Sequence, residues 1–71
     1  MKVIKVKPPF IKLEQFLKFA GITATGGESK NVILNSLVKL NGEICTIRGK
    51  KLFDGDVVYI YNKKYTCSIE N

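Results

Sequence analysis

The residues with the clearest chemical potential lie in one short stretch, Thr25-Gly26-Gly27-Glu28-Ser29-Lys30. A Thr followed three residues later by a Glu is the pattern of a capping box, which predicts that a helix begins there. The first N–H groups of a helix lack intrahelical partners and lie at the positive end of its dipole. The two glycines would let an anion approach these groups, and Lys30 follows one turn later. The stretch lacks the spacing of a P-loop and Glu28 competes for the same N–H groups, so an ordinary capped helix is the alternative interpretation.

A second group of cations follows in Arg48-Gly49-Lys50-Lys51. Clustered positive charges repel one another, and a polyanion relieves that repulsion. The alternative is a charged loop that contacts only solvent. Lys12, Lys30 and Lys39 are predicted on helix starts and at an outward strand position, so that they form one face with this loop. Such a face would bind mainly phosphate groups and would do so with a marked dependence on salt.

The residue types needed for catalysis or metal binding are scarce. There is no His, and no Cys, Ser or Lys stands beside a plausible base, so we do not expect an enzyme. Cys45 and Cys67 cannot form a metal cluster by themselves and are predicted as small apolar residues in strands, although a disulfide between them could form in an oxidising compartment. Asp54 and Asp56 flank a glycine, which is typical of a turn. We therefore expect no cofactor and no metal.

The composition predicts one small basic domain over residues 1–71. A chain of 71 residues buries a small core and has no room for a deep cleft. Its net charge of +6 attracts polyanions, of which nucleic acid is the commonest and an anionic membrane surface the second. A charge that serves only solubility is the third interpretation. Because neither a signal peptide nor an apolar run of roughly 20 residues is recognisable, we expect a reduced, soluble, cytoplasmic monomer without a membrane partner.

Two helices and one strand are predicted in the first half of the chain. Residues 3–6 are expected to form a short edge strand, which the two prolines after Lys7 end. Apolar residues at helical spacing predict a helix over residues 11–20, with Gly21 as its stop. Phe19 shares a flank of this helix with Lys12 and Gln15, and it either joins them in contacting nucleic acid or packs on the N-terminal strand. The second helix is expected from Thr25 to about residue 36.

The second half of the chain is predicted to form β-hairpins. Asn41-Gly42 supplies the two positive-φ residues of a type I′ turn between residues 38–40 and 43–45. A basic loop over residues 46–51 and a turn over 53–56 follow. Residues 57–61 form the strongest predicted strand, 62–64 a turn, and 65–69 an antiparallel return. The expected fold class is α+β, with two helices packed on one side of a small antiparallel sheet of four or five strands.

Five motifs then stand in a characteristic order: Lys12-Leu13-x-Gln15-Phe16-Leu17, Gly21, Glu28-Ser29-Lys30, Val38-Lys39-Leu40-Asn41-Gly42 and Gly55-Asp56-Val57-Val58. In order and spacing they resemble the S4 domain, the small RNA-binding module of a ribosomal protein, of pseudouridine synthases and of a tyrosyl-tRNA synthetase. The resemblance covers residues 11–60, which would be the core of the domain, flanked by the N-terminal strand and the C-terminal hairpin strand. The segments 25–27 and 48–52 resemble more narrowly the short stand-alone S4 proteins of bacteria, the YaaA/YbcJ type.

The resemblance implies an RNA-binding surface of the αL type, formed by the start of each helix and the hairpin that follows. Carried over by position, its contact residues would be Lys12, Gln15, Gly26, Gly27, Ser29, Lys30, Lys39, Asn41, Arg48, Lys50 and Lys51. The resemblance also places Ser29, Val32, Ile33, Val38 and Leu40 inward. Leu34 and Leu37 fall where relatives usually have polar residues, which suggests an additional apolar patch.

Two functional hypotheses follow from these residues. The first is a non-enzymatic module that binds structured RNA, either ribosomal or transfer RNA, through phosphate and 2′-hydroxyl contacts, with a role on the ribosome. The second is a protein–protein adaptor that uses Leu34, Leu37 and exposed aromatic residues, with its positive charge incidental.

Overall fold

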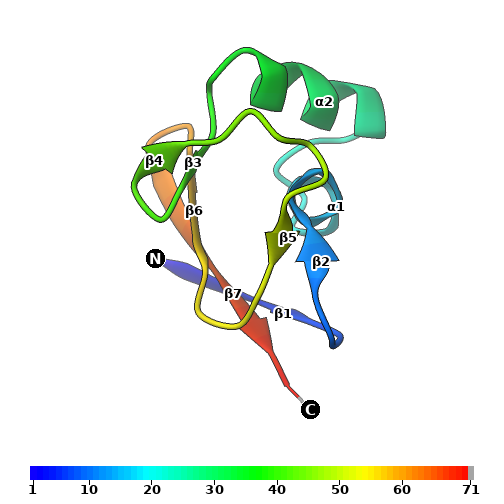
Figure 1. Ribbon diagram of the computed structural model, residues 1–71, viewed down its shortest axis with the longest axis vertical. Coiled ribbons are helices and arrows are strands. Elements are labelled where there is room, and N and C mark those ends of the chain that lie inside the picture. Colours follow the sequence, from blue (N-terminus) through cyan, green and yellow to red (C-terminus); the bar gives the residue numbers. More distant parts are fainter. Residues whose placement is uncertain (71) are drawn as a thin grey trace.

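The computed structural model describes residues 1–70 and combines two short helices with seven short strands (Figure 1). The helices are α1 (Leu13–Phe19) and α2 (Gly26–Leu34). The strands are β1 (Lys2–Val6), β2 (Ile11–Lys12), β3 (Lys39–Leu40), β4 (Glu43–Ile44), β5 (Lys51–Leu52), β6 (Val57–Ile60) and β7 (Lys63–Ile69). The predicted α+β class is confirmed.

Five of the strands form one sheet in the order β1-β7-β6-β3-β4, and the other two form the separate ribbon β2-β5. Strand β1 lies at the edge, as predicted, but it pairs with β7 in parallel, from Lys2 opposite Tyr65 to Val6 opposite Ile69. The remaining pairs are antiparallel. The sheet is therefore mixed and not purely antiparallel, because the first strand of the chain runs in the same direction as the last.

The helix predicted over residues 11–20 is shorter than expected and begins at Leu13. Ile11 and Lys12 pair instead with Leu52 and Lys51 in the ribbon. The N–H of Leu13 donates to the carbonyl of Lys50 at 2.8 Å, so the ribbon leads directly into the helix start. The helix ends before Gly21, whose φ of 75° is the left-handed conformation that suits a glycine stop.

Helix α2 begins at the predicted cap. Oγ1 of Thr25 accepts the N–H of Glu28 at 3.1 Å, and Oε1 of Glu28 accepts the N–H of Ala24 at 2.7 Å. The carboxylate of Glu28 thus binds one residue before the position that a capping box uses. The helix ends at Leu34, two residues before the predicted end, because Ser36 adopts a φ of 60°.

Two tight turns join the hairpins of the large sheet. Asn41 and Gly42 have φ values of 51° and 89°, which confirms the turn predicted between β3 and β4. The turn predicted over residues 62–64 lies one residue earlier. Tyr61 and Asn62 occupy it, with φ values of 52° and 62°, and Lys63 already belongs to β7. The pattern missed this turn because a tyrosine is an unusual residue at positive φ.

The core lies where both helices and the inner face of the sheet meet. Its buried apolar members are Ile4, Val6, Leu13, Phe16, Leu17, Val32, Ile33, Val38, Leu52, Val58, Ile60 and Cys67. The inward placement of Val32, Ile33 and Val38 is confirmed, and Leu40 is half-buried against the core. Phe19 is 62% exposed, so it is not buried against the N-terminal strand, although it lines a hollow together with Lys5 and Val6 of that strand.

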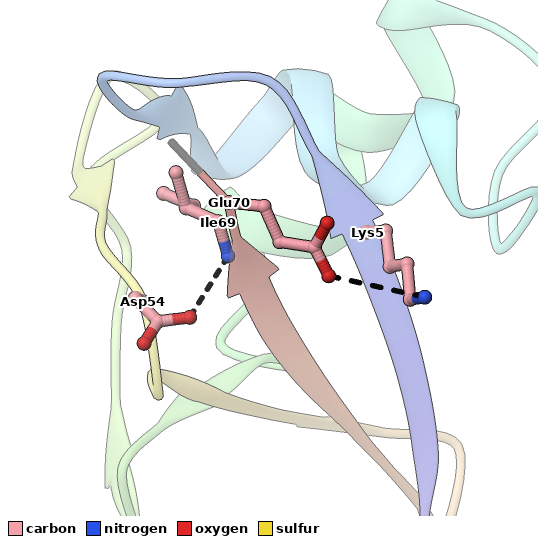
Figure 2. A network of polar contacts seen from close by, with 4 residues as sticks. All are labelled: Lys5, Asp54, Ile69 and Glu70. Carbon is pink, nitrogen blue, oxygen red and sulfur yellow. Dashed lines mark hydrogen bonds and ion pairs between the residues drawn. The ribbon is translucent and has the colours of Figure 1, made fainter.

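The C-terminal end of β7 is fastened to its neighbours by polar contacts (Figure 2). Oδ1 of Asp54 accepts the N–H of Ile69 at 2.8 Å, and Nζ of Lys5 lies 3.9 Å from Oε1 of Glu70. Asp56 accepts the N–H of Phe53 at 2.8 Å within the same turn. Both aspartates thus have the turn role that the sequence predicts.

Candidate nucleic-acid interface

Two lysines face each other across the ribbon. Lys12 of β2 and Lys51 of β5 are directly opposite in an antiparallel pair, and both are exposed. Side chains at such positions project to the same side, with Cβ atoms about 5 Å apart, and like charges there destabilise the pair. This ribbon therefore concentrates positive charge at a cost to the fold, and a bound anion would remove that cost.

The basic loop continues from the ribbon over the start of α1. The carbonyl of Arg48 accepts the N–H of Glu14 at 3.2 Å, next to the contact between Lys50 and Leu13. These contacts occupy the first N–H groups of α1, so this helix offers no free N-terminus. They also hold the exposed Arg48 and Lys50 beside Lys12 and Lys51. Glu14 is the acidic neighbour, with Oε2 at 4.0 Å from Nη1 of Arg48.

The first turn of α2 has two N–H groups without a protein partner. Those of Gly26 and Gly27 have no acceptor within residues 1–70, whereas that of Glu28 donates to Thr25. A Cβ at Gly26 would meet nothing within 4 Å, and one at Gly27 would meet only Oγ1 of Thr25, at 3.9 Å. Neither glycine has a positive φ. The fold therefore requires glycine at neither position, and the turn leaves two donors accessible to an anion.

The other predicted contact residues on the helices differ in whether their side chains reach the surface. Lys30 is exposed on α2, and Gln15 is exposed on α1, where its Oε1 accepts the N–H of Lys12 at 3.3 Å. Ser29 is fully buried and its hydroxyl is hydrogen-bonded to that of Thr23. The prediction of Ser29 as an RNA contact is therefore wrong, because its side chain does not reach the surface.

The hairpin residues Lys39 and Asn41 are built into the large sheet. Nδ2 of Asn41 donates to Oδ1 of Asp56 at 3.1 Å, and Oδ1 of Asn41 accepts the N–H of Val57 at 2.8 Å. Its side chain thus joins the β3–β4 turn to the segment before β6, which is a structural role. Lys39 is exposed, and its Nζ lies 5.9 Å from the ring centre of Tyr59.

Sequence reasoning missed two aromatic residues beside the ribbon. Nζ of Lys51 lies 4.8 Å from the ring centre of Phe10, and the rings of Phe10 and Phe53 are 6.2 Å apart at 52°. Phe53 is exposed and Phe10 is half-buried. Each phenylalanine stands at the outer end of one ribbon strand, in Phe10-Ile11-Lys12 and Lys51-Leu52-Phe53, a symmetry that the sequence contained.

Other kinds of site find no support within residues 1–70. No cluster of His, Cys, Asp and Glu suited to a metal ion occurs there, and neither helix is long and apolar enough to cross a membrane. Cys45 and Cys67 are free thiols. Burial raises the pKa of the Cys67 thiol, with a further contribution from the charges of Asp56 and Asp54. A raised pKa keeps this thiol protonated and unreactive at neutral pH.

These features define a small α+β domain in which Lys12, Arg48, Lys50 and Lys51 lie on or next to the β2–β5 ribbon. Comparison with known proteins gives its family: the family model described as S4 domain matches residues 4–68. The chain belongs to the S4 domain family, as the sequence motifs predicted. The family and the ribosome-associated relative described next support an RNA-binding or ribosome-related role for this chain.

One relative by sequence supports the family, and one solved structure supports the fold. The chain is 40% identical over 57 residues to the probable ribosome maturation protein RlbA of Bacillus subtilis, and the match covers 80% of each chain. The crystal structure of the 30S ribosomal protein S4e from Thermoplasma acidophilum matches with a TM-score of 0.58 and 22% identity. That match covers 76% of this chain but only 27% of the archaeal protein, and at this identity it supports the fold alone.

Proposed function

We propose that this chain binds structured RNA, ribosomal or transfer RNA, without catalysing a reaction, through a basic surface centred on the ribbon. The like-charged pair Lys12–Lys51 carries the proposal. An exposed like-charged pair costs the fold up to about 1 kcal/mol, and the contact of Lys51 with the ring of Phe10 works against this cost. A phosphate between the two ammonium groups turns this repulsion into attraction. Arg48 and Lys50, held beside the pair by their carbonyl contacts with α1, supply further phosphate contacts.

The start of α2 is proposed as the second part of the same surface. The free N–H groups of Gly26 and Gly27 suit a phosphate oxygen, and the exposed Lys30 adds charge one turn later. Contacts of this kind read the shape of a folded RNA backbone and not its base sequence. The name of the Bacillus relative, a probable ribosome maturation protein, favours ribosomal RNA and a place in the cytoplasm.

We also infer that residues 1–71 form one S4-like domain, with the family core in 11–60. The flanking strands support this inference because Ile4 of β1 and Cys67 of β7 are buried in the same core as α1 and α2. A monomer is expected. Sedimentation of the purified chain tests that expectation, and a dimer would contradict it.

The test compares the parent with a Lys12→Gln/Lys51→Gln variant in binding a transfer RNA transcript and a ribosomal RNA hairpin. We expect the affinity to fall at least tenfold at low salt. The slope of log K against log salt should become shallower by about two, because two phosphate contacts are lost. The thermal stability should stay the same or rise, because the repulsion within the ribbon is gone.

The matched control is Lys5→Gln/Lys18→Gln, which removes the same charge from β1 and from the last turn of α1. Equal losses in the two variants would mean that only net charge matters, and the proposed surface would then be wrong. Equal binding by the parent and the ribbon variant would contradict the proposal directly.

The adaptor hypothesis keeps one supporting observation. Leu34 and Leu37 are each 51% exposed, at the end of α2 and just beyond it, so about half of each apolar side chain is open to solvent. Leu34→Asp should then abolish a salt-insensitive protein contact while RNA binding stays unchanged. Loss of RNA binding in the same variant would instead assign Leu34 to the RNA surface.

A further inference from the structure

The outer face of the five-stranded sheet carries a tyrosine between two lysines. Tyr59 of β6 pairs with Lys39 of β3 on one side and with Lys64 of β7 on the other. Directly paired residues project from the same face of a sheet. Val58 and Ile60, on either side of Tyr59 in the strand, are fully buried, so Tyr59 points away from the core. The half-buried ring of Tyr59 thus lies between two lysines on this face, with Nζ of Lys39 at 5.9 Å from the ring centre.

Tyr59 also lines two adjoining grooves. The groove of about 550 Å³ includes Lys39 and Lys64, and the groove of about 670 Å³ adds Lys2 and Lys63. No Asp or Glu within residues 1–70 lines either groove. We call this region the sheet surface; it comprises Lys39, Tyr59 and Lys64, because Lys2 and Lys63 pair with Tyr65 and Ile60 and so project from the other face.

The charge of β7 is divided between its two ends. Lys63 and Lys64 begin the strand, whereas Glu70 follows its last residue and lies beside Lys5, with Asp54 on the neighbouring turn (Figure 2). The carboxylates at the far end are occupied by their own partners. No ion pair within residues 1–70 involves Lys39 or Lys64, so both ammonium groups are available to an anion.

The tip of the β6–β7 hairpin adds a strained, exposed aromatic residue. Tyr61 has a φ of 52° at the first position of the turn, where glycine or asparagine would fit without strain. It is also 57% exposed, so burial does not compensate for that conformation. The next residue, Asn62, accepts the hydroxyl of Tyr59 at 3.1 Å, which holds that ring in place. A largely exposed aromatic residue at a strained turn position suggests a ligand.

We propose that the sheet surface, together with Tyr61, binds unpaired RNA nucleotides. Their bases stack on the tyrosine rings, and the phosphates between them contact the lysines, which is the chemistry of single-strand recognition. This surface lies on the opposite side of the sheet from the core. Its ligand is distinct from the folded backbone proposed for the ribbon, so one copy of the protein engages two segments of RNA.

The experiment uses a labelled eight-nucleotide oligouridylate and a fully paired RNA hairpin, and it measures both affinities by fluorescence anisotropy at low salt. Tyr61→Gly should weaken oligouridylate binding about tenfold and leave hairpin binding unchanged. Its melting temperature should be equal or higher, because glycine relieves the positive φ. Lys64→Gln should reduce the salt slope for the oligouridylate by about 0.7.

The ribbon variant Lys12→Gln/Lys51→Gln should give the reverse pattern, with the hairpin lost and the oligouridylate retained. If the ribbon variant binds the RNA hairpin as tightly as the parent does, the proposal for the ribbon is wrong, and the proposal for the sheet surface is unaffected. Unchanged oligouridylate binding by Tyr61→Gly would overturn the stacking proposal. Equal loss of both RNAs in the ribbon variant would overturn the second surface. The proposal for the sheet surface would also be wrong if Tyr61→Gly weakened binding to phosphatidylserine vesicles but left oligouridylate binding unchanged.

Discussion

Replacing Gly26 and Gly27 by alanine tests whether the first turn of α2 is kept bare for a ligand. Neither glycine needs a positive φ, and an added Cβ meets no atom closer than the 3.9 Å to Thr25. At such positions a Gly→Ala change stabilises a protein by about 0.4–1 kcal/mol, chiefly by restricting the unfolded chain. The two changes together should therefore add about 1–2 kcal/mol to the free energy of unfolding.

The same two methyl groups should weaken RNA binding. They would stand beside the free N–H groups of Gly26 and Gly27, in the space through which a phosphate approaches. A gain of 1 kcal/mol raises the melting temperature of a domain this size by about 4–8 °C. We therefore expect a higher melting temperature by circular dichroism, together with an RNA affinity reduced about tenfold in the anisotropy assay. A gain in stability combined with a loss of function is hard to explain by damage to the fold.

Asn31→Ala provides the control within the same helix. Asn31 is exposed on α2 beyond the first turn, and alanine is the better helix former by up to about 0.7 kcal/mol. This variant should gain stability and keep its RNA affinity. If the double alanine variant is more stable and binds RNA as well as the parent does, the glycines do not serve a ligand. If the double alanine variant is less stable than the parent, the added methyl groups do not fit the first turn, and the fold itself requires the glycines.

Three further predictions concern side chains with a structural role or a particular degree of burial. Asn41→Ala should lower the free energy of unfolding by about 1–3 kcal/mol in urea titrations, because it removes both hydrogen bonds that join two turns; an unchanged value would deny that role. Ser29→Ala should cost a similar amount, because it leaves the buried hydroxyl of Thr23 without its partner, whereas an RNA contact at Ser29 would instead lower affinity at constant stability. A thiol reagent at pH 8 should label the half-buried Cys45 well before Cys67, since burial raises the pKa of the Cys67 thiol and keeps it protonated; equal rates would contradict this.

Local chemistry made the turns and caps of this chain predictable. Thr25 with Glu28, and Asn41 with Gly42, each use a short-range rule that distant contacts did not override. Tyr61 shows the opposite case. Its side chain favours a strand, so the pattern extended β6 through it, whereas the chain turns there at positive φ. A site under strain is where a propensity rule is expected to fail.

Distant pairings were beyond local rules. The apolar spacing around Ile11 fits a helix, but Ile11 and Lys12 form a ribbon with a segment some forty residues later, and no local rule specifies that partner. For the same reason, the sequence did not predict that Lys12 and Lys51 pair directly, although both lysines were expected on one face. Ser29 illustrates a third limit, because a small polar residue on a helix gives no sign of whether it lies inward.

The parallel pairing of β1 with β7 also governs when this chain can finish folding. Strand β1 can pair only after β7 has been synthesised, since β7 is the only neighbour of β1 in the described sheet. Closing a contact between such distant strands is slow, because the entropy of the intervening chain is lost before the pairing is gained. A nascent chain that ends before Lys63 therefore lacks two strands and not one, and it leaves the apolar side of Ile4 and Val6 uncovered. Synthesis of β7 is therefore required before β1 can take its place in the sheet.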